Sequence, residues 1–264
     1  MVARVQQQEV APSSGIFAAT VGPIIEVTIA RAEEGNRLPP VAIAALNRVL
    51  ERAEDDESIA GLVLRGEGRD FCSGGVFSDP GSTEISPDYK PSIGEFYSRW
   101  ATRSFPVLSI AQGSSTAFGC AVALSSDISI VSDTATFQLP ELGNGLVPVY
   151  AISLLATRFD FSMIRDLVLT RRAMSASRAL ELGAVTEVFP VDEIAGEVER
   201  YVEHWKSAGA KSLRQAIRTF RRLSSAPTPA AVKEIADEGL DELFRRVRAG
   251  ESDQTYLEGG KHEG

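Results

Sequence analysis

Three short segments hold the residues of this chain whose types and spacing could do chemistry. Two are turns at residues 71–75 and 117–121, and each follows an apolar run that predicts a buried strand. The third is a loop at residues 140–145, in which Glu141 is the one acidic residue. Backbone N–H groups at such turns can hold an oxygen that gains negative charge, and a carboxylate can move a proton beside it. These segments therefore predict acid–base chemistry next to a polarised carbonyl group.

The composition is typical of a globular protein in solution, since 44% of the 264 residues are hydrophobic and 24% are charged. The net charge of −9 argues against nucleic-acid binding. No segment reaches the ~18 apolar residues that span a bilayer, and residues 1–14 lack the apolar core of a signal peptide. Cys72 and Cys120 have no metal-ligand spacing and suit a reducing compartment. We expect a cytoplasmic protein that binds neither metal, membrane nor nucleic acid.

Short β-rich runs alternate with helical runs along most of the chain. Strands are predicted at residues 16–20 and 24–30, joined as a hairpin, and at 61–64, 107–111 and 128–131. Helices are predicted from Pro40 onward, at 93–102 and at 118–125, and a mobile loop is predicted at 76–92. The unit that repeats is strand–strand–helix, which indicates a layered α/β core.

The last third of the chain is helical. One helix is predicted at residues 192–205, and another runs from Thr228 (N-cap) and Pro229 (N1) to about Ala249. The second helix carries an apolar stripe that must be buried, either on its own core or on a neighbouring subunit. The stripe consists of Val232, Ile235, Ala236, Leu240, Leu243 and Val247. We therefore expect residues 196–264 to form a helical oligomerisation or lid region, and the assembly to be a homotrimer or homohexamer.

Five segments, in order, resemble motifs of the crotonase (enoyl-CoA hydratase/isomerase) superfamily. Residues 65–75 resemble its G-x-x-F-C/S-A-G-x-D segment, 105–113 its K-P-V-I-A-A-V-x-G strand, 117–127 its G-G-G-x-E helix, 137–145 its F-x-x-P-E-x-x-x-G loop, and 174–185 its I-S-A-x-E-A-x-x-x-G-L-V segment. The resemblance runs from about residue 16 to 195. It implies an α/β fold, a crotonase-type spiral of strand–strand–helix repeats with a C-terminal helical layer, and a core at residues 15–195 with an acyl-thioester site.

The resemblance also assigns residues to that site. Gly75 and Phe118 match the two residues whose backbone N–H groups form the oxyanion hole, and Glu141 matches a catalytic glutamate. The predicted substrate-binding residues are Asn36, Leu38, Ser73, Gly74, Gly119, Ala121 and Tyr150. No separate cofactor is implied, because coenzyme A or phosphopantetheine is carried by the substrate, an acyl-CoA or an acyl-carrier protein.

Ala121 is the main departure from the family pattern, because hydratases of the family carry a second glutamate at this position. A single base suffices to move a double bond, whereas water addition needs two acid–base groups, so isomerisation of an enoyl thioester is the leading prediction. Asp127 is interpreted as a structural residue at a helix end. The alternatives are an enoyl hydratase, a carrier-protein-linked 3-hydroxyacyl dehydratase of polyketide type, and a non-catalytic acyl-CoA-binding protein. Serine-peptidase chemistry is disfavoured, because His204 and His262 do not follow a candidate serine at a suitable distance.

Other side chains are open to two interpretations. Lys211, Arg214, Arg218, Arg221 and Arg222 recur at helical spacing. They could bind the phosphates of coenzyme A or an acidic carrier protein, or they could form a solvated helix face. Tyr89, Tyr97 and Trp100 could line the acyl pocket, although core or surface positions are commoner for such residues.

Overall fold

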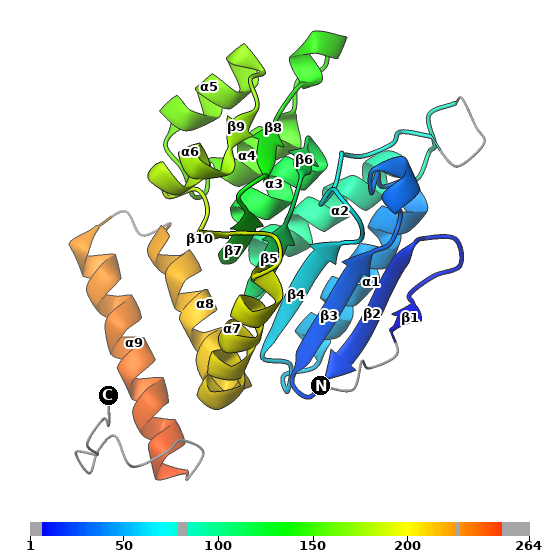
Figure 1. Cartoon of the computed structure of the whole chain (residues 1–264). Coiled ribbons are helices and arrows are strands. Elements are labelled where there is room, and N and C mark those ends of the chain that lie inside the picture. Colours follow the sequence, from blue (N-terminus) through cyan, green and yellow to red (C-terminus); the bar gives the residue numbers. More distant parts are fainter. Residues whose placement is uncertain (1–6, 79–83, 225–227, 250–264) are drawn as a thin grey trace. The chain divides into compact units, whose positions relative to one another are not determined.

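The computed structural model describes residues 7–78, 84–224 and 228–249 (Figure 1). The chain folds into two compact units, Met1–Arg214 and Gln215–Gly264. The first unit contains both β-sheets and every residue assigned above to the candidate site. Among the described residues, no helix is both long and apolar enough to cross a lipid bilayer.

The main sheet has seven strands in the order β1-β2-β3-β4-β5-β7-β10. Their bounds are β1 Gln8–Glu9, β2 Ile16–Val21, β3 Ile24–Ile29, β4 Gly61–Gly66, β5 Val107–Ala111, β7 Ile128–Ser132 and β10 Glu187–Phe189. The predicted hairpin is confirmed, because β2 and β3 pair in antiparallel register around a turn in which Gly22 has a φ of 60°. From β3 to β10 the strands are parallel, and β5 is buried along its whole length, as its unbroken apolar run predicts.

A second, smaller sheet contains β6 (Ser114–Thr116), β8 (Thr136–Gln138) and β9 (Met174–Ser175). An isolated bridge from Cys72 to Ser115 places the segment after β4 beside this sheet. From β4 to α4, each turn of the chain therefore adds one strand to the main sheet, one segment in or beside the small sheet and one helix (Figure 1). The predicted strand–strand–helix spiral is confirmed.

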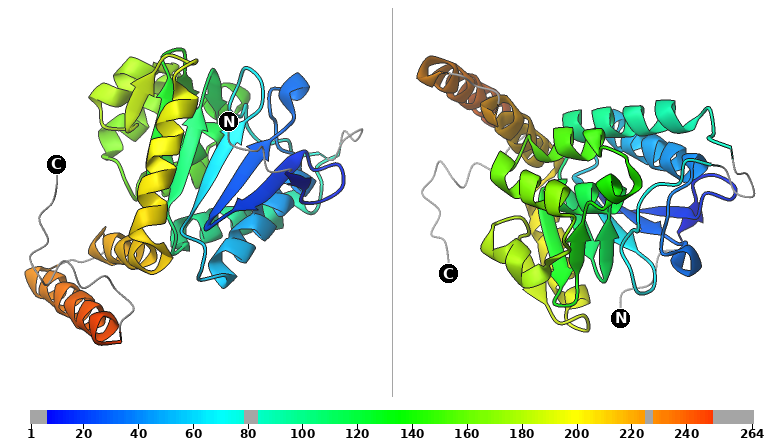
Figure 2. Two further views of the ribbon diagram at one scale, coloured as in Figure 1. Left: turned by 60° about the horizontal axis from the view of Figure 1, so that its bottom comes forward. Right: turned by 90° about the horizontal axis from the view of Figure 1, so that it is seen from above.

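Helices cover both faces of the main sheet. On one face, α1 (Pro40–Asp55), α2 (Tyr89–Thr102) and α3 (Phe118–Ser125) enclose the larger apolar core. On the other face lies α7 (Ile194–Ala208) (Figure 2). Its Ile194 and Trp205 share a smaller apolar cluster with Leu108 and Ile130 of the sheet. The remaining helices are α4 (Val149–Leu155), α5 (Phe161–Thr170), α6 (Ala176–Glu181), α8 (Ala210–Ser224) and α9 (Pro229–Arg248), with 3₁₀ turns η1 (Ala32–Glu34) and η2 (Glu141–Asn144).

The start of α2 differs from the sequence prediction. The helix begins at Tyr89, not at Ile93, so the segment predicted as a loop at 76–92 is shorter than expected. Pro91 does not prevent this start, because the N–H groups of a first helical turn have no intrahelical acceptor and a proline there costs little. Residues 79–83 of the predicted loop lie outside the described part of the chain.

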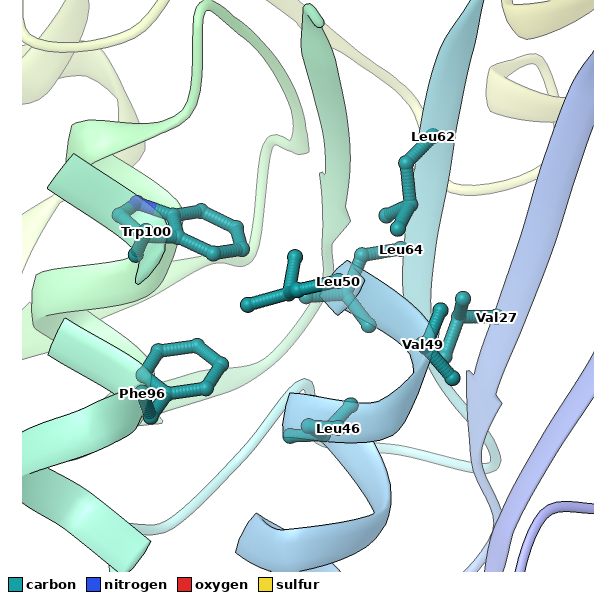
Figure 3. A pocket seen from close by; sticks show the side chains of 8 residues that line it. All are labelled: Val27, Leu46, Val49, Leu50, Leu62, Leu64, Phe96 and Trp100. Atoms are coloured by element: carbon teal, nitrogen blue, oxygen red, sulfur yellow. The ribbon is translucent and has the colours of Figure 1, made fainter. Parts of the chain in front are cut away.

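A small cavity lies between α1, α2 and the sheet (Figure 3). Its volume of about 10 Å³ is at the lower limit for one water molecule, and its lining residues are all apolar. They are Val27, Leu46, Val49, Leu50, Leu62, Leu64, Phe96 and Trp100. The indole N–H of Trp100 donates to Ser125 Oγ at 2.8 Å, so this residue is a satisfied core side chain. The cavity is too small for an acyl chain, and Trp100 does not line an acyl pocket.

In the second unit, the described part of α8 after Arg214 is linked to α9 by polar contacts. Gln215 Nε2 donates to the carbonyl oxygen of Gly239 at 3.0 Å, and Arg222 forms an ion pair with Glu238. The predicted N-cap of α9 is confirmed, because Thr228 Oγ1 accepts from the N–H of Ala231 at 3.2 Å. The apolar stripe of α9 is only partly covered, because Ile235 is buried whereas Val232 and Leu240 are exposed.

Arg214 corrects the prediction of a basic helix face, because its side chain is buried and not solvated. Its guanidinium donates to the carbonyl oxygens of Ile59 (3.0 Å), Asp56 (2.8 Å) and Ala53, and to Ser104 Oγ (2.7 Å). Ala53 and Asp56 belong to the C-terminal end of α1, where carbonyl groups lack intrahelical partners and a cation is favourable. Arg214 is therefore a structural residue that caps α1.

We predict that Arg214→Ala lowers the free energy of unfolding by about 2–3 kcal/mol, because charged hydrogen bonds to buried carbonyl groups are lost. Arg214→Lys should restore little of this, since an ammonium group cannot reproduce the guanidinium fork. Chemical denaturation followed by circular dichroism measures the change. The control is Arg178→Ala, which removes an exposed ion pair with Glu181 and should change stability little. Equal effects of the two alanine variants would contradict the capping role.

Candidate active site

The backbone N–H group of Gly75 donates no hydrogen bond to any described residue. Its neighbours are held on both sides, because Leu38 N–H donates to the carbonyl oxygen of Gly74 and Val76 N–H donates to that of Leu38, each at 2.9 Å. In such a parallel bridge, the N–H group of the residue between the two bonds points away from the partner strand. Gly74, with a φ of 107°, makes the turn that this arrangement requires.

Phe118 presents a second N–H group of this kind. It is the first residue of α3, where an N–H group has no intrahelical acceptor. The preceding residue, Ala117, has a φ of 53° and a ψ of −114°, an unusual backbone conformation for a residue with a side chain. The ring of Phe118 is buried against Phe96 (4.7 Å between centroids) and Tyr97 (5.8 Å). Only its backbone N–H group is therefore available to a ligand, and the ring serves the core.

The two N–H groups belong to segments that run side by side. Thr116 N–H donates to the carbonyl oxygen of Cys72 at 2.9 Å, and a Cβ atom on Gly74 would lie 3.1 Å from the Cβ of Ala117. The approach is closest at Gly119, where a Cβ atom would lie 2.1 Å from the carbonyl oxygen of Cys72. Because the N-terminus of α3 adds its positive dipole, this pair of segments is suited to an oxygen that carries negative charge.

Glu141 supplies the carboxylate. It is the first residue of η2, and its Oε2 atom is buried without a hydrogen-bond partner among the described residues. Loss of hydration disfavours the charged form, so burial raises the pKa of Glu141 above its ordinary value. The negative charge of Glu141 in turn raises the pKa values of Tyr89 and Cys120, although burial is the larger cause for both. An unpartnered, partly desolvated carboxylate of this kind is suited to accept a proton from a bound molecule.

The position of the family's second glutamate is occupied by Ala121, three residues after Phe118 on α3. Ala121 is fully buried and its N–H group donates to the carbonyl oxygen of Ala117 at 3.0 Å. Asp127 does not replace the missing acid. Its Oδ2 accepts from Arg103 Nη2 (2.7 Å) and from the N–H group of Val107 (2.8 Å), which confirms its structural role at the end of α3.

The two cysteines near these segments are not nucleophiles. Both are buried and free, as their apolar surroundings in the sequence predict. Burial raises the pKa of Cys72 to about 12 and also raises the pKa of Cys120. Both thiols therefore remain protonated at neutral pH, and a thiolate is what nucleophilic chemistry needs.

Three tyrosines of the first unit lie near Glu141, and the structure distinguishes their roles. The Tyr89 hydroxyl lies 2.9 Å from the position that a Cβ atom on Gly75 would take. Tyr97 is buried, and its ring stacks on the partly exposed ring of Tyr150 with centroids 5.1 Å apart. The Tyr150 hydroxyl lies 3.1 Å from the Cβ position of Gly94 in α2. Tyr150 therefore connects α4 to α2, and its contact with substrate stays a prediction.

The predicted substrate-binding residues of the N-terminal part hold the turn that precedes Gly75. Asn36 is fully buried, and its Nδ2 donates to the carbonyl oxygens of Glu67 (2.9 Å) and Asp70 (2.7 Å). The backbone N–H and carbonyl groups of Leu38 are both bonded to the segment around Gly75, and the N–H group of Ser73 donates to the carbonyl oxygen of Gly35 at 3.0 Å. Contact of these three residues with substrate stays a prediction.

The fold and the site together define an α/β protein with two backbone N–H groups that lack acceptors and one partly buried carboxylate. A family model described as enoyl-CoA hydratase/isomerase matches residues 20–263, and the chain belongs to this enzyme family. The carnitinyl-CoA dehydratase of Salmonella arizonae is 28% identical over 237 residues, which cover 87% of this chain and 84% of that protein. The 2,3-dehydroadipyl-CoA hydratase of Escherichia coli is 24% identical over 200 residues, which cover 73% and 78%.

Solved structures confirm the crotonase-type fold. Human enoyl Coenzyme A hydratase domain-containing protein 3 superposes with a TM-score of 0.82 at 18% identity, covering 93% of this chain and 98% of that one. An enoyl-CoA hydratase/isomerase from Marinobacter aquaeolei superposes with a TM-score of 0.81 at 23% identity, covering 94% and 98%.

We predict that Gly119→Ala lowers the free energy of unfolding by about 1–3 kcal/mol or more, because the new methyl group would overlap the carbonyl oxygen of Cys72. Activity should fall as well, since the two oxyanion-binding segments must separate. Gly196→Ala is the matched control in α7, because no described atom beyond its chain neighbours and its own helix backbone lies within 4 Å of its Cβ position. It should be neutral or stabilise the protein by up to about 1 kcal/mol. A Gly119→Ala protein as stable as the parent would contradict the close approach.

Proposed function

We propose that the protein acts on acyl thioesters, stabilising an enolate at the N–H groups of Gly75 and Phe118 while Glu141 acts as the single base. The observation that carries this proposal is the buried, unpartnered Oε2 of Glu141, together with two backbone N–H groups without acceptors. The charge of Glu141 acts on Tyr89, whose hydroxyl lies against Gly75. The substrate is a thioester of coenzyme A or of a phosphopantetheine-bearing carrier protein. It brings its own carrier group, so no separate cofactor is required.

The reaction that suits one base is migration of a double bond. In a 3-enoyl thioester, Glu141 removes a proton from the α carbon, and the electron pair of that C–H bond moves into a dienolate whose oxygen accepts from Gly75 and Phe118. The protonated Glu141 then returns a proton to the γ carbon, which gives the 2-enoyl thioester. Atoms and charge balance, and the carboxylate is regenerated without a second acid.

Water addition or removal is the second candidate, and the names of the relatives favour it, because they are hydratases and a dehydratase. Against it stands Ala121, since a positioned acid or base contributes about 10²–10⁴-fold and this chain has lost one of the pair. For this candidate to apply, a group elsewhere in the site would have to hold the water in place of the missing glutamate.

We also propose that residues 196–264 contribute to a homotrimer or homohexamer. The support within the described residues is the exposure of Val232 and Leu240 on α9, which leaves apolar surface to cover. A monomeric mass by light scattering at micromolar concentration would contradict this assembly.

We predict that Glu141→Gln lowers turnover by at least ~10²-fold while leaving folding and thioester binding intact, because the amide is nearly isosteric and cannot accept the proton. The parent and the variant are each given 3-enoyl- and 2-enoyl-CoA in deuterated water, and migration and water addition are followed by NMR. Migration of the double bond supports the isomerase proposal, and protium retained at the γ carbon shows direct transfer by a single base. Hydration without migration by the parent would replace it by the second candidate, and full activity of Glu141→Gln would refute both.

We further predict a pH signature of the buried carboxylate. Since burial raises the pKa of Glu141 above 4.5, the acidic limb of kcat/KM should lie at a higher pH than an exposed glutamate would give. The folded protein also holds this proton to a higher pH than the unfolded chain, so ionisation of Glu141 reduces stability as pH rises through the interval above 4.5. Glu141→Gln should therefore melt higher than the parent at pH 7 and equally at pH 4. A lower melting temperature of the variant at pH 7 would contradict the desolvated environment.

A further inference from the structure

The hydroxyl group of Tyr89 lies against the backbone of Gly75. A Cβ atom at residue 75 would lie 2.9 Å from this oxygen and 3.5 Å from Cε2 of the ring, so only glycine leaves room for the side chain. The ring is held in place by the edge of Phe77, with centroids 4.8 Å apart and the planes at 62°. Tyr89 is also the first residue of α2, and its N–H group donates to the carbonyl oxygen of Ser86 at 3.2 Å. Both contacts direct the hydroxyl towards the Gly75 side of the site.

Within the described part of the chain, no residue uses the Tyr89 hydroxyl as donor or acceptor. Glu141 is near enough for its charge to act on Tyr89, yet Glu141 Oε2 has no hydrogen-bond partner, so the hydroxyl is not bonded to that atom. The family's second glutamate is absent, because residue 121 is an alanine. The Tyr89 hydroxyl is therefore adjacent to Gly75 and has no hydrogen-bond partner among the described residues.

The electrostatics favour a donor that keeps its proton. Burial, the charge of Glu141 and the neighbouring Tyr150 raise the pKa of Tyr89 to about 12. A phenol with such a pKa stays neutral throughout the pH range of ordinary enzymes, so it can donate a hydrogen bond but does not readily give up the proton. A neutral donor is also what an enolate formed near a carboxyl group requires, because a hydrogen bond stabilises the new charge without altering the base.

We propose that Tyr89 is a further catalytic residue, whose hydroxyl donates a third hydrogen bond to the thioester oxygen beside the N–H groups of Gly75 and Phe118. The inference rests on the proposed function and deepens it. All three hydrogen bonds strengthen as negative charge develops on the oxygen, so a third donor stabilises the enolate more than the bound thioester. In this protein, the hydrogen bond from Tyr89 offsets part of the catalytic contribution that is lost with the second glutamate.

The test uses acetoacetyl-CoA as the probe, because its enolate absorbs in the near ultraviolet and carries its charge partly on the thioester oxygen. The apparent pKa of the bound probe is measured by pH titration for the parent, for Tyr89→Phe and for the control Tyr201→Phe on α7, which covers the opposite face of the sheet. Tyr89→Phe keeps the ring and its contact with Phe77. Melting temperature and probe affinity are recorded for each protein.

We expect the parent and Tyr201→Phe to lower the pKa of the bound probe equally relative to the free thioester. In Tyr89→Phe, the pKa of the bound probe should be higher than in the parent by at least one unit, which is a tenfold change in its acid dissociation constant. We also expect kcat on the enoyl thioester to fall by about 10-fold or more, with KM and melting temperature nearly unchanged. The same probe pKa and kcat in Tyr89→Phe as in the parent would overturn the assignment while leaving the proposed function intact. A parent protein that binds the probe without lowering its pKa would overturn the proposed function and this inference with it.

Discussion

The site depends on one steric constraint, the contact between the backbone after β4 and the backbone that enters α3. At Gly119 this contact leaves no space for even a methyl group, because the carbonyl oxygen of Cys72 would lie 2.1 Å from it. The hydrogen bond from Thr116 to Cys72 fixes the register of the two segments. Because Gly75 and Phe118 lie within three residues of Cys72 and Thr116, this contact brings their two segments together. The bridge to Leu38 then orients the N–H group of Gly75.

Around this contact, side chains fill the core while backbone N–H groups stay available to a ligand. The rings of Phe118, Phe96 and Tyr97 fill the space behind α3, so that the backbone of Phe118 is presented while its side chain packs. The same apolar surroundings remove water from one oxygen of Glu141 and raise its pKa. That desolvation costs stability at neutral pH, and the extensive core on the α1–α3 face of the sheet tolerates it.

The departures from the family pattern have different physical consequences. Ala121 removes a carboxylate and leaves a fully buried methyl group, which changes the number of acid–base groups. Phe118 in place of glycine changes no donor, because only the backbone is required of it. Tyr150 changes no acid–base group, and its ring stacks on Tyr97 with centroids 5.1 Å apart. The acid–base inventory of the site is therefore altered at residue 121.

By itself, the sequence determined the local elements and the identity of the reactive groups. Apolar periodicity, prolines at helix starts and an N-cap at Thr228 identified most strands and helices, because these signals involve neighbours along the chain. The ordered motifs also identified Gly75, Phe118 and Glu141, although contact of these residues with substrate remains to be tested. Only the tertiary structure placed Arg214 on the end of α1, 158 positions before it at Asp56, and brought Tyr89 against Gly75. Helical spacing cannot distinguish a solvated arginine from a buried one, because the difference arises from carbonyl groups supplied by a remote segment.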